Sequence, residues 1–453
     1  MNPNAEIDSK DAAKESPRSD LILLGVLASL AGLGAGAIGA LFRLALEQAN
    51  RFRDALIARA DGWGIGGFVL VVALAAGAAA LAAWLVRRVA PSAGGSGIPR
   101  VMVVLDGAMP PAPLRVIPVK FLAGTLSMGS GLALGREGPT VQMGASIAHQ
   151  IGKLLRRSWS DCRALMAAGA GAGFAVAFNA PIAGALFVFE GLLKRFEARL
   201  VIAALAASAV AIWVGRAIAG DTPEFTVGAL AQPGLDKMPF FVVLGIGAGL
   251  AGTLYNRTLL ATLRATDRFS GLPVEWRAAM VGAAVGAIAW FSPSLVGGGD
   301  GLAQQALRGE GTLLVLPVLF FFRLGLIACS VAAGAPGGLL VPFLALGAEL
   351  GLWIGLLCAL AFPGMAFEPA GFALVGMAAL FAAIVRAPLT AIVLVSEITA
   401  NSTMLLPMIV ACFAAMLVST LFDDRSILDS LKEQLLARSQ STARDVDHPN
   451  ARK

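Results

Sequence analysis

Long apolar segments recur along this chain from about residue 20 to residue 422, and they constrain its fold more than any other feature. Several reach the length of about 20 residues that a helix needs to cross the hydrocarbon core of a membrane. Hydrophobic residues make up 57% of the chain and charged residues only 14%. Soluble domains carry roughly 25% charged residues. The pattern therefore predicts an all-α polytopic membrane protein.

Other apolar segments are shorter and are interrupted by glycine or proline. Examples are residues 118–134 and 388–397. Broken helices are tolerated at membrane depth only where protein or a water-filled cavity covers the backbone. We therefore expect tilted and broken helices beside the full spans.

The two ends of the chain differ in composition from the apolar region. Residues 1–19 are polar and residues 431–453 are charged. We assign residues 20–430 as the membrane region. We do not expect residues 1–19 to be a signal peptide, because no short apolar segment with a small-residue cleavage site follows them. The net charge is +6, from 35 basic and 29 acidic residues. Excess Lys and Arg residues gather on the cytoplasmic side of membrane proteins, so we expect both termini to be cytoplasmic.

The sequence contains an internal repeat. A shift of 203 positions places the glycine and proline pattern of residues 135–152 on residues 338–355, and a shift of 207 places residues 178–190 on residues 385–397. Two-fold repeats with broken helices at matching positions are typical of transporters that bind their substrate near the membrane midplane.

The repeat divides the apolar region into two halves. These span about residues 20–215 and 238–422, and the polar stretch 219–239 joins them.

Three glycine-rich segments mark predicted helix starts. They are residues 94–99, 135–139 and 334–342, and each ends in a proline, a residue that fits the first turn of a helix. The N-terminus of a helix offers free N–H donors and a partial positive charge, which together attract anions. Three such ends meeting at the midplane would bind an anion without a full countercharge, so the anion could also leave.

Two side chains stand out in these segments. Glu137 is an ionisable residue at membrane depth, where charge is costly and usually functional. Its carboxylate would compete with an anion for the same N–H groups, which makes it a candidate gate. The alternative is a loop carboxylate paired with Arg136. Ser96 offers a hydroxyl donor to an anion or serves as an ordinary N-cap.

Further charged residues lie within apolar stretches. For these we expect structural roles at helix ends or in ion pairs; they are Arg136, Glu190, Arg386 and Glu397.

Residues 95–99, 135–139 and 337–342 resemble the three anion-site motifs of the CLC family of chloride channels and chloride/proton antiporters. The resemblance covers about residues 20–430 and is to the bacterial type without a C-terminal regulatory domain. It implies an inverted two-fold repeat of about 18 helices. It also implies a homodimer in the bacterial inner membrane, with one pore per subunit.

The resemblance assigns roles to individual residues. It implies that Ser96 is the inner-gate hydroxyl and that Glu137 is the external gate and proton acceptor. The N–H groups of Leu339 and Leu340 would bind the central anion. The implied anion-binding positions are Gly95, Ser96, Gly97, Ile98, Arg136, Gly138, Leu339 and Leu340.

The chain departs from the family pattern at two positions. Gly191 stands where antiporters of the family usually carry an inward-facing glutamate, and Leu428 falls at the position of the central tyrosine. The single tyrosine of the chain, Tyr255, lies far from every motif in the sequence. We therefore expect one of the two side-chain hydroxyls at the anion site to be missing.

These features support chloride transport through a pore gated by Glu137, with weak or absent proton coupling because Gly191 cannot hold a proton. The alternative is a chloride/proton antiporter with a substitute proton path, formed by water or by Glu349. A fluoride exporter is less favoured because the chloride-type motifs are intact.

An enzyme is not expected. Only two histidines and four scattered cysteines are present, which gives neither a nucleophile–base pair nor a metal-ligand set. The expected partners are chloride, protons in the antiporter alternative and the lipid bilayer, without a cofactor or nucleic acid.

Overall fold

The computed structural model describes residues 18–268 and 271–447, and within these ranges it contains seventeen α-helices and no β-strand. The prediction of an all-α fold is confirmed. The first half contains α2 (Arg18–Ala60), α3 (Ile65–Val89), α4 (Ile98–Leu105), α5 (Val116–Gly129), α6 (Glu137–Leu154), α7 (Trp159–Phe178), α8 (Pro181–Phe187) and α9 (Ala198–Ala219). The second half contains α10 (Met238–Arg268), α11 (Val274–Phe291), α12 (Asp300–Leu307), α13 (Val315–Ala332), α14 (Leu340–Ala361), α15 (Pro369–Val385), α16 (Pro388–Ile398) and α17 (Leu405–Leu421), and α18 (Ile427–Asp447) follows.

Seven of the described helices are long and apolar enough to cross a membrane, judged by length and composition. They are α2, α3, α9, α10, α11, α13 and α14. Large apolar side chains such as Trp213, Phe321 and Leu421 are exposed on the surface of the molecule. In water such a surface would be costly, whereas in a bilayer it faces lipid. The chain is therefore a polytopic membrane protein, as the sequence predicts.

The repeat predicted from the sequence is visible in the order of the helices. The series α2 to α9 is followed by α10 to α17, in which each helix matches the one eight places earlier. The short helices α4 and α12 each have 8 residues. A single turn of 3-10 helix precedes each of them, Pro91–Ala93 before α4 and Pro293–Leu295 before α12.

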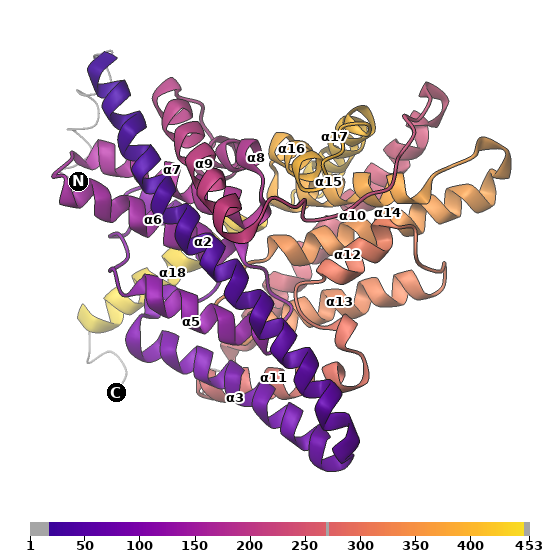
Figure 1. Cartoon of the computed structure of the whole chain (residues 1–453), viewed down its shortest axis with the longest axis horizontal. Coiled ribbons are helices and arrows are strands. Elements are labelled where there is room, and N and C mark those ends of the chain that lie inside the picture. The colour runs from indigo at the N-terminus through magenta and orange to yellow at the C-terminus, as the bar shows by residue number, and fades with distance from the viewer. Residues whose placement is uncertain (1–17, 269–270, 448–453) are drawn as a thin grey trace.

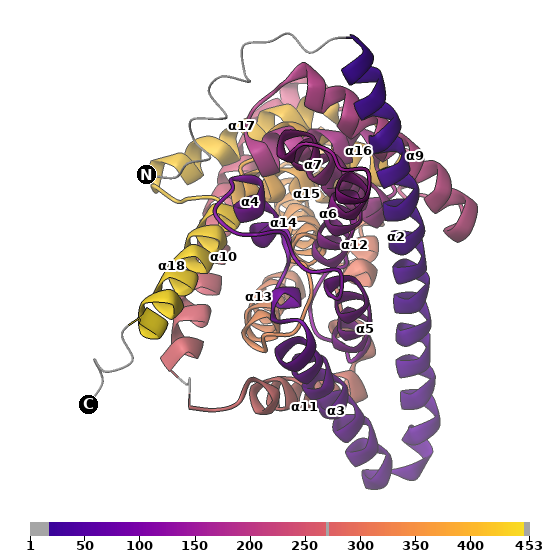
Figure 2. The same cartoon turned by 90° about the vertical axis from the view of Figure 1, so that its left-hand side faces the viewer.

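The two halves lie side by side. In Figure 1, α6 and α7 are on the left and α13 and α14 are on the right, with the long α2 crossing in front. Figure 2 shows α2 running along one edge of the molecule. Helix α18 follows the second half but returns to the first, where it packs against α4. The boundary predicted at residue 430 falls inside α18.

Glycines allow close helix crossings at matching places in the two halves. A Cβ atom added to Gly144 of α6 would overlap the carbonyl oxygen of Gly169 of α7, and one added to Gly347 of α14 would overlap that of Gly376 of α15. Small residues at such crossings let two backbones approach closely, which is how membrane helices associate without a hydrophobic driving force. These crossings hold the helices that begin at the predicted site.

We expect the substitution Gly144→Ala to lower the melting temperature of the protein in detergent. An extra carbon in a close-packed contact costs about 1–3 kcal/mol because the helices must move apart. Gly77→Ala is the matched control, because no atom lies within 4 Å of the position where its Cβ would be. Equal melting temperatures for the two variants would show that the α6–α7 crossing is not close-packed.

Candidate anion site

The N-termini of α6 and α14 meet at a two-residue antiparallel bridge. Gly135 N–H donates to Gly338 O at 2.8 Å, and Gly338 N–H donates to Gly135 O at 2.6 Å. These two glycines are 203 positions apart and are equivalent in the repeat. Helix α6 begins at Glu137 and α14 at Leu340, so the bridge places two helix N-termini next to each other.

Glu137 lies across this junction. Its side chain is fully buried, at 0% exposure, and its Oε1 accepts a hydrogen bond of 2.6 Å from the backbone N–H of Leu340. Among the described residues, Oε2 has no hydrogen-bond partner. A Cβ atom at Gly135 or Gly338 would overlap the carboxylate, so both glycines are required for it to fit. The carboxylate therefore occupies the helix-end position at which an anion was predicted.

Ser96 approaches the same junction on a loop with unusual backbone angles. The φ angles of Gly95 and Gly97 are 63° and 94°, a region that favours glycine. Buried Lys120 holds the loop by donating to Ala93 O at 2.9 Å and to Gly95 O at 2.7 Å. The Ser96 Oγ is buried, and no described residue forms a hydrogen bond with it.

The remaining predicted positions fall around this loop. A Cβ at Gly138 would overlap Ser96, so the first turn of α6 lies directly against the loop. Gly337 N–H donates to Gly95 O at 3.3 Å, which joins the loop to the segment before α14. Ile98 begins α4, and Leu339 directly precedes α14. The structure thus gathers the backbones of all three glycine-rich segments in one place.

Arg136 is a predicted anion-binding residue whose side chain is used elsewhere. Its Nε donates to Ala177 O at 2.7 Å, and its guanidinium forms an ion pair with Glu224 of the segment that joins the two halves. Glu224 also lies 3.7 Å from the guanidinium of Arg43 on α2. Glu137 is consequently not the ion-pair partner of Arg136, and the pairing role expected for this arginine is confirmed.

A cavity of about 430 Å³ extends to the Ser96 loop. Its lining includes Ser96 and Leu339, together with Arg87, Arg100, Arg277 and Arg438, and among the described residues it contains no acidic side chain. Arg87 is paired with Glu275 at 2.6 Å. A cleft lined by one sign of charge concentrates ions of the other sign, so this cavity favours anions near Ser96.

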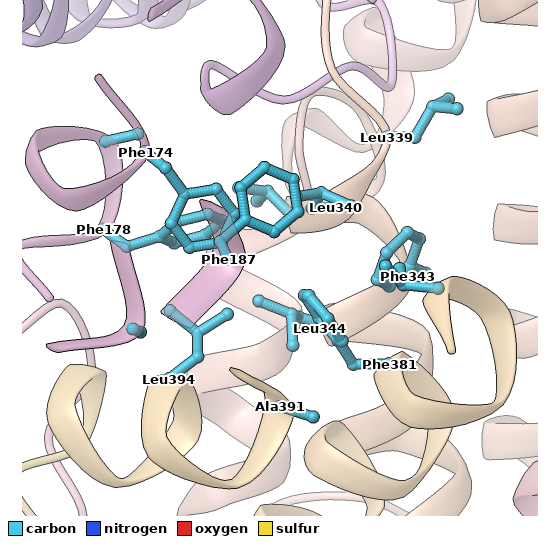
Figure 3. Close-up of a cluster of buried hydrophobic side chains, with 14 of the residues drawn as sticks. Phe174, Phe178, Phe187, Leu339, Leu340, Phe343, Leu344, Phe381, Ala391 and Leu394 are labelled. Atoms are coloured by element: carbon cyan, nitrogen blue, oxygen red, sulfur yellow. The ribbon is translucent and has the colours of Figure 1, made fainter. Parts of the chain in front are cut away.

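The two altered positions are buried among apolar groups. Gly191 lies in a π-helical turn, Val188–Leu193, and a Cβ there would contact the ring of Phe187. That ring stacks on Phe174 with centroids 4.2 Å apart. Figure 3 shows Phe174, Phe178 and Phe187 grouped together, with Leu340 and Phe343 on the adjacent helix. Leu428 lies in the first turn of α18 and is 1% exposed.

Glu190 and Glu397 cap each other's helices across the repeat. Glu190 accepts from the N–H groups of Leu389 and Thr390 at the start of α16, at 3.0 and 2.6 Å. Glu397 accepts from the N–H groups of Ile182 and Ala183 at the start of α8, at 3.1 and 2.8 Å. The structural role expected for both glutamates at helix ends is confirmed.

Arg386 also binds backbone groups. It donates to the carbonyl oxygens of Asp424 at 2.6 Å and Met416 at 3.3 Å. The helix-end role expected for this arginine is likewise confirmed.

Glu349 lies in the middle of α14. It is 1% exposed, and neither carboxylate oxygen has a hydrogen-bond partner in the described part of the chain. It interacts electrostatically with Arg323, which is fully buried on α13 and donates to Leu295 O and Gly297 O at 3.0 Å. At 1.5 Å per helical residue, Glu349 lies roughly 14 Å along α14 from Leu340.

Two residues near the site were not identified from the sequence motifs. Glu224 lies in the connecting segment and reaches Arg136 only because that segment crosses the first half. Tyr255 lies on α10, is 1% exposed, and packs against Phe343 in the first turn of α14. The one sequence signal that could have indicated Tyr255 is that it is a lone polar aromatic residue in an apolar segment.

The fold and the junction are typical of one class of protein, namely membrane transport proteins with a two-fold repeat and broken helices, whose ends here meet at a buried candidate anion site. The sequence model of the family described as Voltage gated chloride channel matches residues 76–420. The chain belongs to this family, as the motifs indicated, and it is a transport protein rather than an enzyme.

Curated relatives extend the match along nearly the whole chain. The H(+)/Cl(-) exchange transporter ClcA of Vibrio parahaemolyticus is 35% identical over 99% of this chain and 97% of its own length. The protein of that name from Yersinia pestis is also 35% identical, over 95% of this chain and 91% of its own length.

Solved structures share the fold. A slow cyanobacterial Cl-/H+ antiporter superposes with a TM-score of 0.88 at 34% identity, covering 92% of this chain and 99% of its own. A eukaryotic CLC transporter has a TM-score of 0.78 at 23% identity and covers 92% of this chain and 74% of its own, which shows a shared fold only.

We expect Glu397→Gln to lower the melting temperature in detergent. The substitution leaves one oxygen to accept from two N–H groups, and hydrogen bonds to charged groups contribute about 1.5–3 kcal/mol each. Glu310→Gln is the control, because Glu310 is exposed just after the end of α12. If the two variants melted at the same temperature, the reciprocal caps would contribute nothing to stability.

Proposed function

We propose that this chain exchanges chloride for protons across the membrane and that Glu137 couples the two ions, because its carboxylate binds the proton and competes with chloride for the same helix end. The observation that carries the proposal is the buried Glu137 carboxylate on the N–H of Leu340, at 2.6 Å. The exchange-transporter names of the relatives and of the 34% identical structure support a chloride/proton antiporter over a pore with weak or absent proton coupling, which Gly191 favoured.

The mechanism follows from the charge on one side chain. While Glu137 is ionised, its carboxylate occupies the N–H donor at the start of α14 and closes the anion path. Protonation removes that negative charge, so chloride can replace the carboxylate at the helix end. Each proton bound at Glu137 therefore opens the site to an anion, which couples the two ions.

The site binds chloride through partial charges. The N–H groups of α14 and the hydroxyl of Ser96 are neutral donors. The guanidinium of Arg136 instead donates to Ala177 O and forms an ion pair with Glu224. Lys120 is likewise engaged with two loop carbonyls. Neutral donors hold an anion weakly enough for it to leave.

We infer that water beside the Ser96 loop, rather than a second acidic side chain, passes protons to and from Glu137. Gly191 has no side chain that could carry a proton, and the ring of Phe187 fills the space beside it. The cavity of about 430 Å³ is large enough for several waters. Its lining ends at Leu339, the residue directly before α14, and Glu349 is not part of it. Water therefore suits the role of substitute acceptor better than Glu349 does.

We also propose how the subunits assemble and how they are oriented in the membrane. One chain contains all three glycine-rich segments, so each subunit of a homodimer would carry its own complete pathway. We propose that this homodimer lies in the bacterial inner membrane with both termini in the cytoplasm. The bacterial relatives and the excess of basic residues support this placement.

We expect Glu137→Ala to abolish proton movement while chloride flux continues. The substitution removes both the proton acceptor and the group that blocks the helix end. Purified protein in liposomes, with chloride efflux and proton uptake recorded together, provides the measurement.

Wild-type protein in the same liposomes is the reference, and its reversal potential must depend on the proton gradient. Loss of all chloride flux in a folded Glu137→Ala protein would contradict the gate assignment. A wild-type reversal potential set by chloride alone would contradict coupling.

We expect Glu349→Gln to leave the ratio of protons to chloride unchanged. Glu349 lies outside the cavity that reaches Ser96 and roughly 14 Å along the helix from the gate contact. The same liposome assay measures the ratio. A proton flux that falls while chloride flux persists would show that Glu349 carries the protons and that water does not.

A further inference from the structure

Tyr255 is a buried polar group that no part of the mechanism has used. It is the only tyrosine of the chain, lies on α10 and is 1% exposed. Its hydroxyl forms no hydrogen bond with any described residue. Buried hydroxyls nearly always have a partner, because an unpaired one loses its hydrogen bonds to water without compensation. An unpartnered hydroxyl in a protein interior therefore indicates a partner outside the protein chain, such as a water molecule or a ligand.

The ring of Tyr255 packs against the first turn of α14. It packs edge-to-face on Phe343, with centroids 5.8 Å apart and planes at 82°. Phe343 lies one turn after Leu340, whose N–H holds the gate carboxylate. The charge of Glu137 also acts electrostatically on the Tyr255 hydroxyl. Tyr255 thus packs against the helix whose N-terminus forms the candidate anion site, although it is far from the site motifs in sequence.

Two polar atoms at the junction of α6 and α14 also lack partners. They are Ser96 Oγ and Glu137 Oε2, both buried and both without a hydrogen bond to the described residues. The hydroxyls of Ser96 and Tyr255 are donors, and so are the N–H groups at the start of α14. A set of neutral donors suits an anion, because an anion accepts several hydrogen bonds at once.

We propose that the Tyr255 hydroxyl donates a hydrogen bond to the transported anion at the N-terminal end of α14, as a second hydroxyl beside that of Ser96. The proposal rests on the proposed chloride transport and adds a ligand to its site. It also supplies, from α10, the hydroxyl that Leu428 cannot provide.

The test is the chloride affinity of the purified protein in detergent, measured by isothermal titration calorimetry on wild type and on Tyr255→Phe. Phenylalanine keeps the ring on Phe343 and removes only the oxygen. Hydrogen bonds to a charged group are among the stronger ones, so we expect binding about tenfold weaker. Thr253→Val is the matched control, because the Thr253 hydroxyl is buried on the same helix but donates to Gly249 O at 3.0 Å.

Ser96→Ala separates this proposal from the function on which it rests. Weaker binding in both Ser96→Ala and Tyr255→Phe, with Thr253→Val unchanged, supports both hydroxyls as ligands. Unchanged binding in Tyr255→Phe beside weakened binding in Ser96→Ala overturns the role of Tyr255 alone. Absence of chloride binding and flux in wild type overturns the proposed function itself.

The melting temperature in chloride-free buffer gives a second readout. Removal of an unpaired buried hydroxyl should leave the melting temperature of Tyr255→Phe equal to or above that of wild type. A clear decrease would show that the hydroxyl has a structural partner within the protein, and it would overturn the proposal.

Discussion

The structure depends on a pair of backbone hydrogen bonds between Gly135 and Gly338, at 2.8 and 2.6 Å. Because these glycines are equivalent in the repeat, the pseudo-two-fold relation between the halves passes through this bridge. Each glycine lies just before a long helix, so the bridge brings two partial positive charges together inside an apolar protein. Any side chain on either glycine would displace the carboxylate that lies between the helices.

The repeat is symmetric in its backbone but not in its charge. Glu137 is the first residue of α6, and its equivalent in the repeat, Leu340, is the first residue of α14. A single carboxylate therefore lies between the two helices, where it accepts a hydrogen bond from the N–H of Leu340. A carboxylate on both sides would repel across the junction, and two leucines would leave a permanently available anion site. In the proposed mechanism, this single negative charge among neutral donors lets a proton open the site. Glu190 and Glu397, by contrast, are equivalent in the repeat, and each caps a helix of the other half.

Much of the fold was predictable because apolar length and helix-start signals are local. The helices begin one or two residues before Pro99, Pro139 and Pro342, as the glycine-rich segments indicated. The repeat also predicted that α6 and α14 are equivalent. Contacts between distant segments were not predictable in this way. The partner of Arg136 is Glu224 of the connecting segment, and the space beside Gly191 is filled by Phe187. Tyr255 carries no motif, and only the packing of α10 on α14 brings it to the site.

In the proposed mechanism, the gate carboxylate and the transported anion use the same helix end. Crystals of Glu137→Gln grown in bromide, which replaces chloride and scatters X-rays anomalously, test this most directly. We expect an anomalous peak within hydrogen-bond distance of Leu340 N, at the position that the carboxylate oxygen occupies in the present structure. Bromide peaks confined to the arginine-lined cavity, with the substituted side chain at position 137 turned away from an empty helix end, would contradict it.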